Sequence, residues 1–356
     1  MLRYHMAVVT RDNALKREVK RVTTATGSTA TYVRESKEIG SGDDAKPVHL
    51  AIFDARKKNP DKTFLNKVPK DGRIMYVLDG ESLVDKVTLF ADHRCTSLLC
   101  HDARFDEDEF ISSATKALRG DVFGLQKYFP WGVTTFSMVV KNSKEKGKAI
   151  DIMMRYAQLA GVRGPVRDRI QLVCDELMMN ALYHAPTDDQ GREKYHDKTP
   201  KQLAQMDHVS EIQVQYGCSG RYFGVSVRDG GGSLTRKRAL DYLKRAKTGH
   251  HIESKTTGAG LGLVSVLNSV SKLIFNLQPE YSTEVIGLFD MELFAKGKVG
   301  ARSLHIFTAA EQAPADDEDD YEDDDLGASV GPAKMWAIAA FLAGVVVAMG
   351  VAFAMK

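Results

Sequence analysis

Short apolar runs that alternate with amphipathic stretches constrain the fold of the first 130 residues more than any other feature. The runs are YHMAVVT (residues 4–10), VHLAIFD (48–54), RIMYVLD (73–79) and CTSLLCH (95–101), and the stretch DEDEFISSATKAL (106–118) has helical periodicity. Strands that are covered on both faces appear as continuous apolar runs, and the helices between them serve as crossovers. The pattern therefore predicts βαβ units and a doubly wound parallel sheet, an α/β fold, for residues 1–130.

The spacing of these runs resembles a response-regulator receiver domain, in which Asp54 would be the phosphoacceptor at the end of the third strand. The rest of the receiver pattern is missing. Thr10 and Arg11 stand where receivers carry an acidic pair for magnesium, Leu78 replaces a Ser or Thr, and Cys100–His101 replaces a lysine. Without the metal-binding carboxylates, phosphoryl transfer to Asp54 loses most of its charge stabilisation. We expect a degenerate receiver-like domain that serves protein contacts, with Asp54 not phosphorylated.

An apolar stripe predicts a long helix that begins near residue 164. Pro165 suits its first turn, since proline gives up no needed N–H there. The stripe consists of four residues at helical spacing: Ile170, Val173, Leu177 and Ala181. Glu176, Asn180 and His184 follow one another at intervals of four along one flank of this stripe. Polar side chains in that position lie at the edge of the core and face another part of the molecule.

Two glycine-rich stretches follow this helix. YFGVSVRDGGGSL (222–234) is an alternating strand that runs into Asp229 and three glycines, and KTTGAGLGLVSVLNSVSKL (255–273) is a glycine loop that becomes an amphipathic helix. Taken singly, the first is explained by a hairpin turn and the second by an ordinary helix start. Their order and spacing after the polar helix make separate structural explanations less favourable.

The three motifs together, Glu-x-x-x-Asn-Ala, Asp-x-Gly-x-Ser and Gly-x-Gly-x-Gly-Leu, resemble the N, G1 and G2 boxes of GHKL (HATPase-type) ATPases. The segment CDELMMNALYHA (174–185) is most similar to the N box of bacterial anti-sigma-factor serine/threonine kinases. The resemblance extends over about residues 133–310 and includes an opening strand, TTFSMVVKNS, and a first helix, AIDIMMRYAQLAG. It implies a GHKL α/β two-layer sandwich in residues 131–310 that binds ATP and Mg²⁺.

The resemblance implies a role for each matched position. Asn180 would bind Mg²⁺ through its side-chain carbonyl, because an amide coordinates a hard cation without adding charge. Asp229 would accept a hydrogen bond from the adenine amino group, and Gly231 would let the backbone approach the base. Glu176 would be the general base. The phosphate loop would place backbone N–H groups and a helix N-terminus against the phosphates, and it comprises Gly258, Gly260, Leu261 and Gly262.

Simpler explanations compete at several of these positions. Glu176 is alternatively an acid that only hydrogen-bonds locally, and His184 is more often an edge-of-core histidine than a catalyst. The segment 235–257 would be the ATP lid, although a solvated basic face explains its cations equally well. These cations include Arg236, Lys237, Arg238, Lys244, Arg245 and Lys247. Residues 186–208 form a polar insertion whose purpose the sequence does not reveal.

The C-terminal segment MWAIAAFLAGVVVAMGVAFAM (335–355) is apolar throughout. At about 1.5 Å per residue it spans a hydrocarbon core of roughly 30 Å, and a buried core helix is the alternative. Small residues recur at positions 340, 344, 348 and 352, which would let two such helices pack in a homodimer. We expect a single-pass anchor in the cytoplasmic membrane, with the soluble domains in the cytoplasm.

The charge is unevenly distributed along the chain, although an acidic strip does not report membrane orientation, which depends on Lys and Arg. An acidic linker (311–334) precedes the anchor, and nine of the ten residues 316–325 are carboxylates. Without them the net charge of +2 becomes +11 for the remainder, which is a mildly basic body. The four cysteines show no CxxC spacing, and the N-terminus has too short an apolar run for a secretory signal. A reducing compartment is therefore expected.

Three functional classes compete. The first is a serine/threonine kinase that phosphorylates or sequesters a protein partner, an anti-sigma antagonist or sigma-factor-like regulator, in a partner-switching pathway. The second, a histidine kinase, needs a phosphoacceptor histidine upstream of the N box, and no histidine lies between His101 and His184. The third is a membrane-tethered, ATP-dependent scaffold with weak or no catalysis. The sequence favours the first class, with no direct binding of nucleic acid.

Overall fold

The computed structural model describes residues 3–40, 46–80, 83–101, 105–207, 209–248, 259–298 and 300–309. They fall within one compact unit, Met1–Glu311. The expected acidic linker, the expected membrane anchor and Gly258 lie outside the described residues. Within those residues, no helix combines the length and the apolar character that a bilayer crossing requires.

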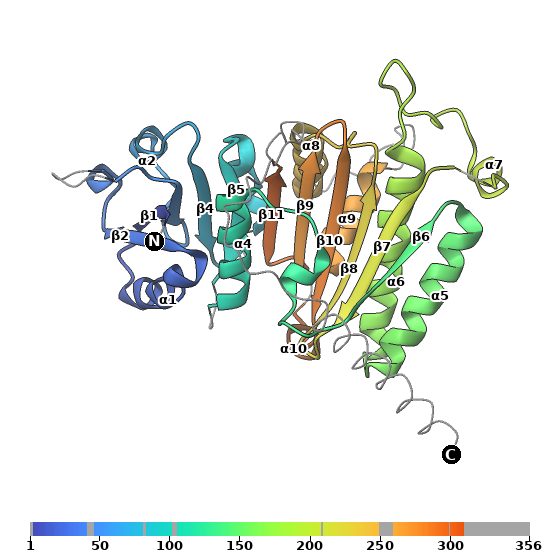
Figure 1. Ribbon diagram of the computed structural model, residues 1–356, viewed down its shortest axis with the longest axis horizontal. Coiled ribbons are helices and arrows are strands. Elements are labelled where there is room, and N and C mark those ends of the chain that lie inside the picture. Colours follow the sequence, from blue (N-terminus) through green and yellow to red (C-terminus); the bar gives the residue numbers. More distant parts are fainter. Residues whose placement is uncertain are drawn as a thin grey trace, which may run out of the picture. The chain divides into compact units, whose positions relative to one another are not determined.

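The strands of the described chain form one mixed sheet of eleven strands, which confirms the expected α/β class (Figure 1). Their order is β2-β1-β3-β4-β5-β11-β9-β10-β8-β7-β6. The first five strands are mutually parallel. They are β1 (Tyr4–Val9), β2 (Ser28–Val33), β3 (Leu50–Asp54), β4 (Arg73–Leu78) and β5 (Cys95–Cys100).

The second half of the sheet is largely antiparallel. Here β6 pairs with β7, β7 with β8, β8 with β10, and β10 with β9, all antiparallel. The bounds are β6 (Thr135–Val140), β7 (Ile212–Cys218), β8 (Tyr222–Asp229), β9 (Lys272–Gln278) and β10 (Ser282–Asp290). The last strand, β11 (Ser303–Thr308), runs parallel to β9 and joins the halves through two antiparallel pairs with β5, Leu304 with Leu98 and His305 with Ser97.

Helices cover both faces of the parallel strands. On one face, α1 (Asn13–Thr23) and α4 (Glu107–Arg119) bury Leu15 and Phe110 against Met6 and Val8 of β1. On the opposite face, α2 (Lys62–Lys67) and α3 (Leu83–Lys86) bring Phe64 and Leu83 into a second core. This alternation follows from the two-residue period of a strand, which sends successive side chains to opposite faces.

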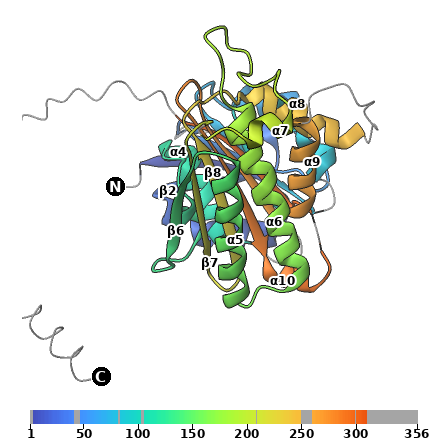
Figure 2. The same cartoon turned by 90° about the vertical axis from the view of Figure 1, so that its right-hand side faces the viewer.

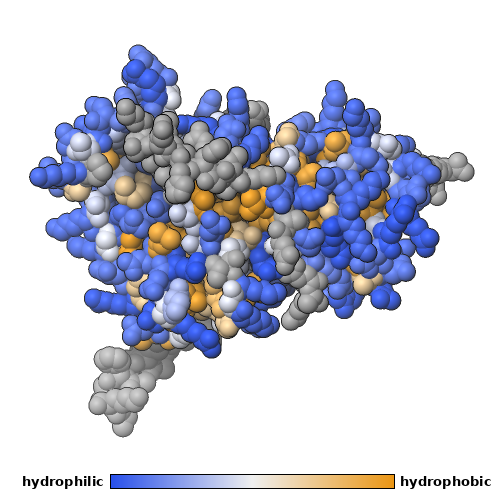
Figure 3. Space-filling model, turned by 180° about the vertical axis from the view of Figure 1, so that it is seen from behind, coloured by the Kyte–Doolittle hydropathy of each residue, from blue (hydrophilic) through white to orange (hydrophobic). Residues whose placement is uncertain are grey.

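The antiparallel strands carry their main helices on one face (Figure 2). These helices are α5 (Ser143–Leu159), α6 (Gly164–Met179), α8 (Arg236–Thr248) and α9 (Ala259–Ser269). The short helices α7 (Pro200–Ala204) and α10 (Met291–Ala295) lie in connections. Figure 3 shows the molecule from the side on which these main helices cover the antiparallel strands, and hydrophobic residues gather toward the middle of this view. On the other face, the 3-10 helix η4 (Leu125–Tyr128) supplies the buried Leu125.

Buried charges join α4 to the strands of the second half. The Lys272 amine at the start of β9 lies 2.8 Å from both Asp106 Oδ2 and Glu109 Oε2. Glu109 Oε1 in turn contacts His305 Nε2 of β11 at 3.0 Å. All of these side chains are at most 12% exposed, and breaking such a pair by removing one partner is strongly destabilising. The two halves are therefore joined by charge pairing as well as by the sheet.

The helix that the sequence places after residue 164 forms as expected. α6 begins at Gly164 with Pro165 in its first turn, and the stripe residues Ile170, Val173 and Leu177 are buried. The helix then passes into a π-helical turn, η5 (Asn180–His184). Such turns inside α-helices frequently occur at functional sites.

Candidate functional site

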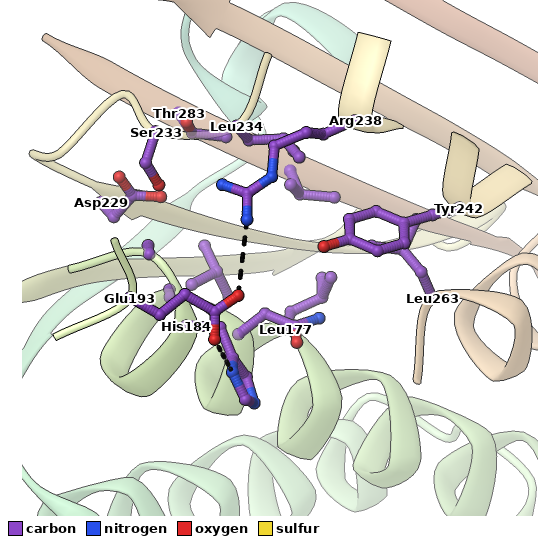
Figure 4. A pocket seen from close by; sticks show the side chains of 15 residues that line it. Leu177, His184, Glu193, Asp229, Ser233, Leu234, Arg238, Tyr242, Leu263 and Thr283 are labelled. Atoms are coloured by element: carbon purple, nitrogen blue, oxygen red, sulfur yellow. Dashed lines mark hydrogen bonds and ion pairs between the residues drawn. The ribbon is translucent and has the colours of Figure 1, made fainter. Parts of the chain in front are cut away.

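An open pocket with a cavity volume of about 70 Å³ lies where the end of α6 meets β8, β10, α8 and α9 (Figure 4). Apolar side chains such as Leu177, Val227 and Leu263 line it together with polar ones. The polar lining residues are Asn180, His184, Glu193, Asp229, Ser233, Arg238, Tyr242 and Thr283. Two of the residues singled out in the sequence, Asn180 and Asp229, are thus brought together.

Asn180 occupies the first position of the π-helical turn. Its side-chain nitrogen Nδ2 is buried and has no hydrogen-bond partner among the described residues. An unpaired buried polar atom costs about 1–3 kcal/mol, and a polar ligand in the cavity would remove that cost. The amide is therefore placed to meet a ligand, and its carbonyl is of the type that Mg²⁺ accepts as a ligand.

Asp229 ends strand β8 and points into the cavity (Figure 4). Its Oδ1 accepts hydrogen bonds from the backbone N–H groups of Gly231 at 2.9 Å and Gly232 at 3.2 Å. Burial raises the pKa of Asp229, although these two hydrogen bonds act in the opposite direction. Both bonds fall on one oxygen, so Oδ2 is left as an acceptor for a ligand.

Two residues at this end of the cavity were not found from the sequence. Thr283 on β10 is paired with Asp229 in the sheet, and its Oγ1 is buried without a partner in the described part of the chain. Gly232 has φ +56°, and a Cβ there would lie 2.5 Å from the Tyr281 nitrogen. At Gly231 an added Cβ meets only ordinary contacts at 3.5 Å. The backbone therefore requires glycine at position 232. At Gly231 the surrounding protein imposes no such requirement, so a requirement for glycine there would have to come from a bound ligand.

Glu176 does not line the cavity, but its carboxylate lies beside the start of α9. A Cβ built on Gly262 would stand 2.1 Å from Glu176 Oε2, so this glycine makes room for the acid. Burial raises the pKa of Glu176, and the neighbouring Asp175 adds to the effect. A carboxylate with a raised pKa is better suited to accept a proton near neutral pH than an ordinary glutamate.

The predicted phosphate loop is described only in part. Gly260, Leu261 and Gly262 lie in the first turn of α9, and Gly258 falls outside the described residues. Leu263, which follows the last glycine, lines the cavity. The N-terminal end of α9 therefore approaches the cavity from the side of Glu176.

A chain of polar side chains crosses the cavity (Figure 4). His184 Nδ1 lies 3.2 Å from Glu193 Oε2, and Arg238 donates from its terminal nitrogen to Glu193 Oε1 at 3.4 Å. Glu193 belongs to the polar insertion, and no local sequence pattern marks it as a cavity residue.

The first cation of the expected lid, Arg236, is directed away from the cavity. It donates to the main-chain carbonyls of Phe90, Asp92, Cys95 and Ile306. These carbonyls belong to β5, to β11 and to the segment around the 3-10 helix η3 (Val87–Ala91). Helix α8 thus connects the cavity, through Arg238, with the junction of the two sheet halves, through Arg236.

The carboxyl ends of β1 and β3 form a second polar site around Asp54. Thr10 Oγ1 donates to Asp54 Oδ2 at 2.8 Å, and Arg56 binds both Asp54 oxygens at 2.8 Å. The same guanidinium contacts Asp12 Oδ2 at 2.8 Å. Burial opposes ionisation of Asp54, but the hydrogen bonds from Arg56 and Thr10 outweigh it and hold its pKa below the ordinary value. One guanidinium therefore pairs with both carboxylates.

No protein-family model matches the chain, and no match is found among curated proteins. Among the described side chains, no group of three or more His, Cys, Asp and Glu residues is arranged to hold a metal ion. The chemistry of the cavity is therefore argued from its own residues.

Proposed function

We propose that the protein binds ATP with Mg²⁺ in the cavity around Asn180 and Asp229 and acts as a serine/threonine kinase of the anti-sigma-factor type. The observation that carries the proposal is the convergence of the three sequence motifs. Asn180 from the first, Asp229 and Ser233 from the second, and Leu263 from the third line one cavity. A shared ligand would explain why residues of all three motifs lie at one cavity.

The arrangement of the sheet supports the fold side of this proposal. The half that begins at β6 has antiparallel strands with α5, α6 and α9 on one face, as a GHKL two-layer sandwich requires. The order β2-β1-β3-β4-β5 of the other half is that of doubly wound folds such as receivers. We assign this half to protein contacts.

The polar groups that line the cavity fit an adenine nucleotide. Asp229 would accept from the adenine amino group, and the Thr283 hydroxyl beside it is free to bind the base or a bridging water. Asn180 would hold Mg²⁺, which when bound neutralises phosphate charge. Glu176 would take the proton from the hydroxyl of a serine or threonine on a protein partner. The partner would be an anti-sigma antagonist or a sigma-factor-like regulator.

One observation favours a second candidate, an ATP-dependent interaction scaffold with little catalysis. The Glu176 carboxylate rests against Gly262 and does not line the cavity. If it stays there when nucleotide binds, the protein would use ATP to set the shape of a protein interface. In both candidates residues 335–355 would hold the protein, as a monomer or a homodimer, at the cytoplasmic membrane.

Calorimetry with Mg·ATP, together with phosphate release or transfer, tests the proposal. Asn180→Ala and Asp229→Asn should weaken nucleotide binding, whereas Glu176→Ala should keep binding and lower turnover by about 10² to 10⁴. Asn268→Ala is the matched control, because Asn268 is exposed on α9 and does not line the cavity. Unchanged affinity in Asn180→Ala and Asp229→Asn would refute the site. Unchanged turnover in Glu176→Ala would favour the scaffold.

A further inference from the structure

The polar insertion between η5 and β7 has a defined structure that fixes the position of Glu193. Thr187 and Glu193 form an isolated antiparallel bridge, which closes the insertion into a hairpin. Tyr195 is buried, and its hydroxyl donates to the carbonyl of Val209 at 2.8 Å. Helix α7 begins with a reciprocal cap between Thr199 and Gln202. A segment held at both ends can present one side chain to the cavity with little loss of entropy on binding.

Glu193 uses this position to hold the side chain of Arg238 at the cavity. Its two oxygens contact His184 and Arg238, and Figure 4 shows the carboxylate between these two side chains. The Glu193 side chain is 17% exposed and that of Arg238 is 42% exposed. At 3.4 Å and partly in solvent, this ion pair is a weak one.

Among the α8 cations whose side chains are described, Arg238 is the one that lines the cavity. Arg236 is bound to main-chain carbonyls at the junction of the two halves, and Lys237 and Lys244 are exposed. Neither of these lysines lines the cavity. Phosphate oxygens bind a guanidinium through short, charge-assisted hydrogen bonds that are stronger than a long, half-exposed carboxylate contact. A phosphate-bearing ligand therefore competes with Glu193 for Arg238.

We propose that Glu193 is a positioning residue that restrains Arg238 and thereby lowers the affinity of the cavity for nucleoside triphosphates. The inference rests on the proposed nucleotide site and deepens it, because it gives the insertion a role in setting nucleotide affinity. Two effects act in the same direction. Binding must break the contact between Glu193 and Arg238, and the carboxylate adds a negative charge to the wall that the phosphates approach.

The test compares Mg·ATP and adenosine binding by calorimetry in the wild type, Glu193→Gln, Arg238→Ala and the double variant. Glu193→Gln should tighten Mg·ATP binding by roughly fivefold to twentyfold and change adenosine binding by less than about twofold. In the Arg238→Ala background the gain should shrink to about twofold or less, since no guanidinium remains to be released. Asp189→Asn is the matched control, because it removes one carboxylate from an exposed position of the same insertion.

The outcomes separate this inference from the proposed function. If the wild type binds neither adenosine nor Mg·ATP, the nucleotide site is wrong and the inference fails with it. If the wild type binds both and Glu193→Gln binds Mg·ATP equally or more weakly, only the restraint by Glu193 is refuted. An equal gain in Asp189→Asn would also refute it, because the effect would then be one of overall charge. Melting temperatures of all variants establish that they are folded.

Discussion

Replacing Gly262 with alanine should displace the carboxylate of Glu176 without unfolding the protein. The new Cβ would lie 2.1 Å from Glu176 Oε2, and ordinary contact begins near 3.4 Å, so the carboxylate must retreat by about 1.3 Å. The displaced atoms are the end of a flexible, half-buried side chain, and such a retreat costs little. Alanine within helix α9 also gains roughly 1 kcal/mol over glycine. We expect the free energy of unfolding to stay within about 1 kcal/mol of the wild type.

The same displacement should be costly for catalysis. Misplacing a reacting group by about 1 Å can lower a rate by roughly 10²-fold. If Glu176 is the general base, ATP turnover in Gly262→Ala should fall by about 10- to 100-fold while adenosine binding is unchanged. Urea unfolding, calorimetry with adenosine, and phosphate release under saturating ATP measure the three quantities.

Two further variants show whether the loss acts through Glu176. Gly147→Ala on α5 is the matched control, because nothing lies within 4 Å of its added Cβ. It should gain stability and keep full turnover. In the Glu176→Gln background, Gly262→Ala should cause no additional loss. Wild-type turnover in Gly262→Ala, or an additional loss in the double variant, would contradict the placement of Glu176 as the base.

Three further predictions follow from the buried charges. Burial raises the pKa of Asp229, so its ionisation destabilises the folded state once the pH exceeds the pKa of this group in the unfolded chain. Asp229→Asn should therefore melt no lower than the wild type at pH 7 but bind adenosine at least about tenfold more weakly. A lower melting temperature would contradict this prediction. Arg56→Ala leaves Asp12 and Asp54 facing each other, so the free energy of unfolding measured in urea should fall by about 1–3 kcal/mol. Millimolar Mg²⁺ should partly restore this loss in the variant and have no such effect on the wild type. A loss that does not respond to Mg²⁺ would contradict the prediction. Burial lowers the pKa of Lys116 to about 7, so above that pH the folded state binds fewer protons than the unfolded state. The free energy of unfolding should therefore rise with pH between about 7 and 10. An equal rise with pH in Lys116→Met would refute the assignment of this effect to Lys116.

Features that depend on local pattern could be predicted from the sequence. The apolar runs correspond to β1, β3, β4 and β5, and the stripe after Pro165 became the buried face of α6. These predictions succeed because the period of apolar residues reports which face of an element is buried. The edge strand β2, STATYV, gives a weaker signal, since most of its residues are only partly buried.

Features that depend on contacts between distant segments could not be predicted. Nothing in the sequence of either strand indicates that β5 pairs with β11, because both strands are ordinary apolar runs. Arg56 was not singled out, although it pairs with both Asp54 and Asp12, because its role depends on where β1 and β3 end. Glu193 reaches the cavity only through the hairpin of the insertion. In each case the relevant geometry arises from tertiary structure.

The position of β11 in the chain has a consequence for synthesis. The residues that meet at this junction, such as Cys100 and Ser303, are 203 positions apart. At roughly 5–20 residues per second, a ribosome needs about 10–40 s to make the intervening chain. During that time the apolar strand β5 has no neighbour on one side, and such an edge is prone to pair with other chains. That edge of β5 is therefore open to pairing with other chains until β11 emerges.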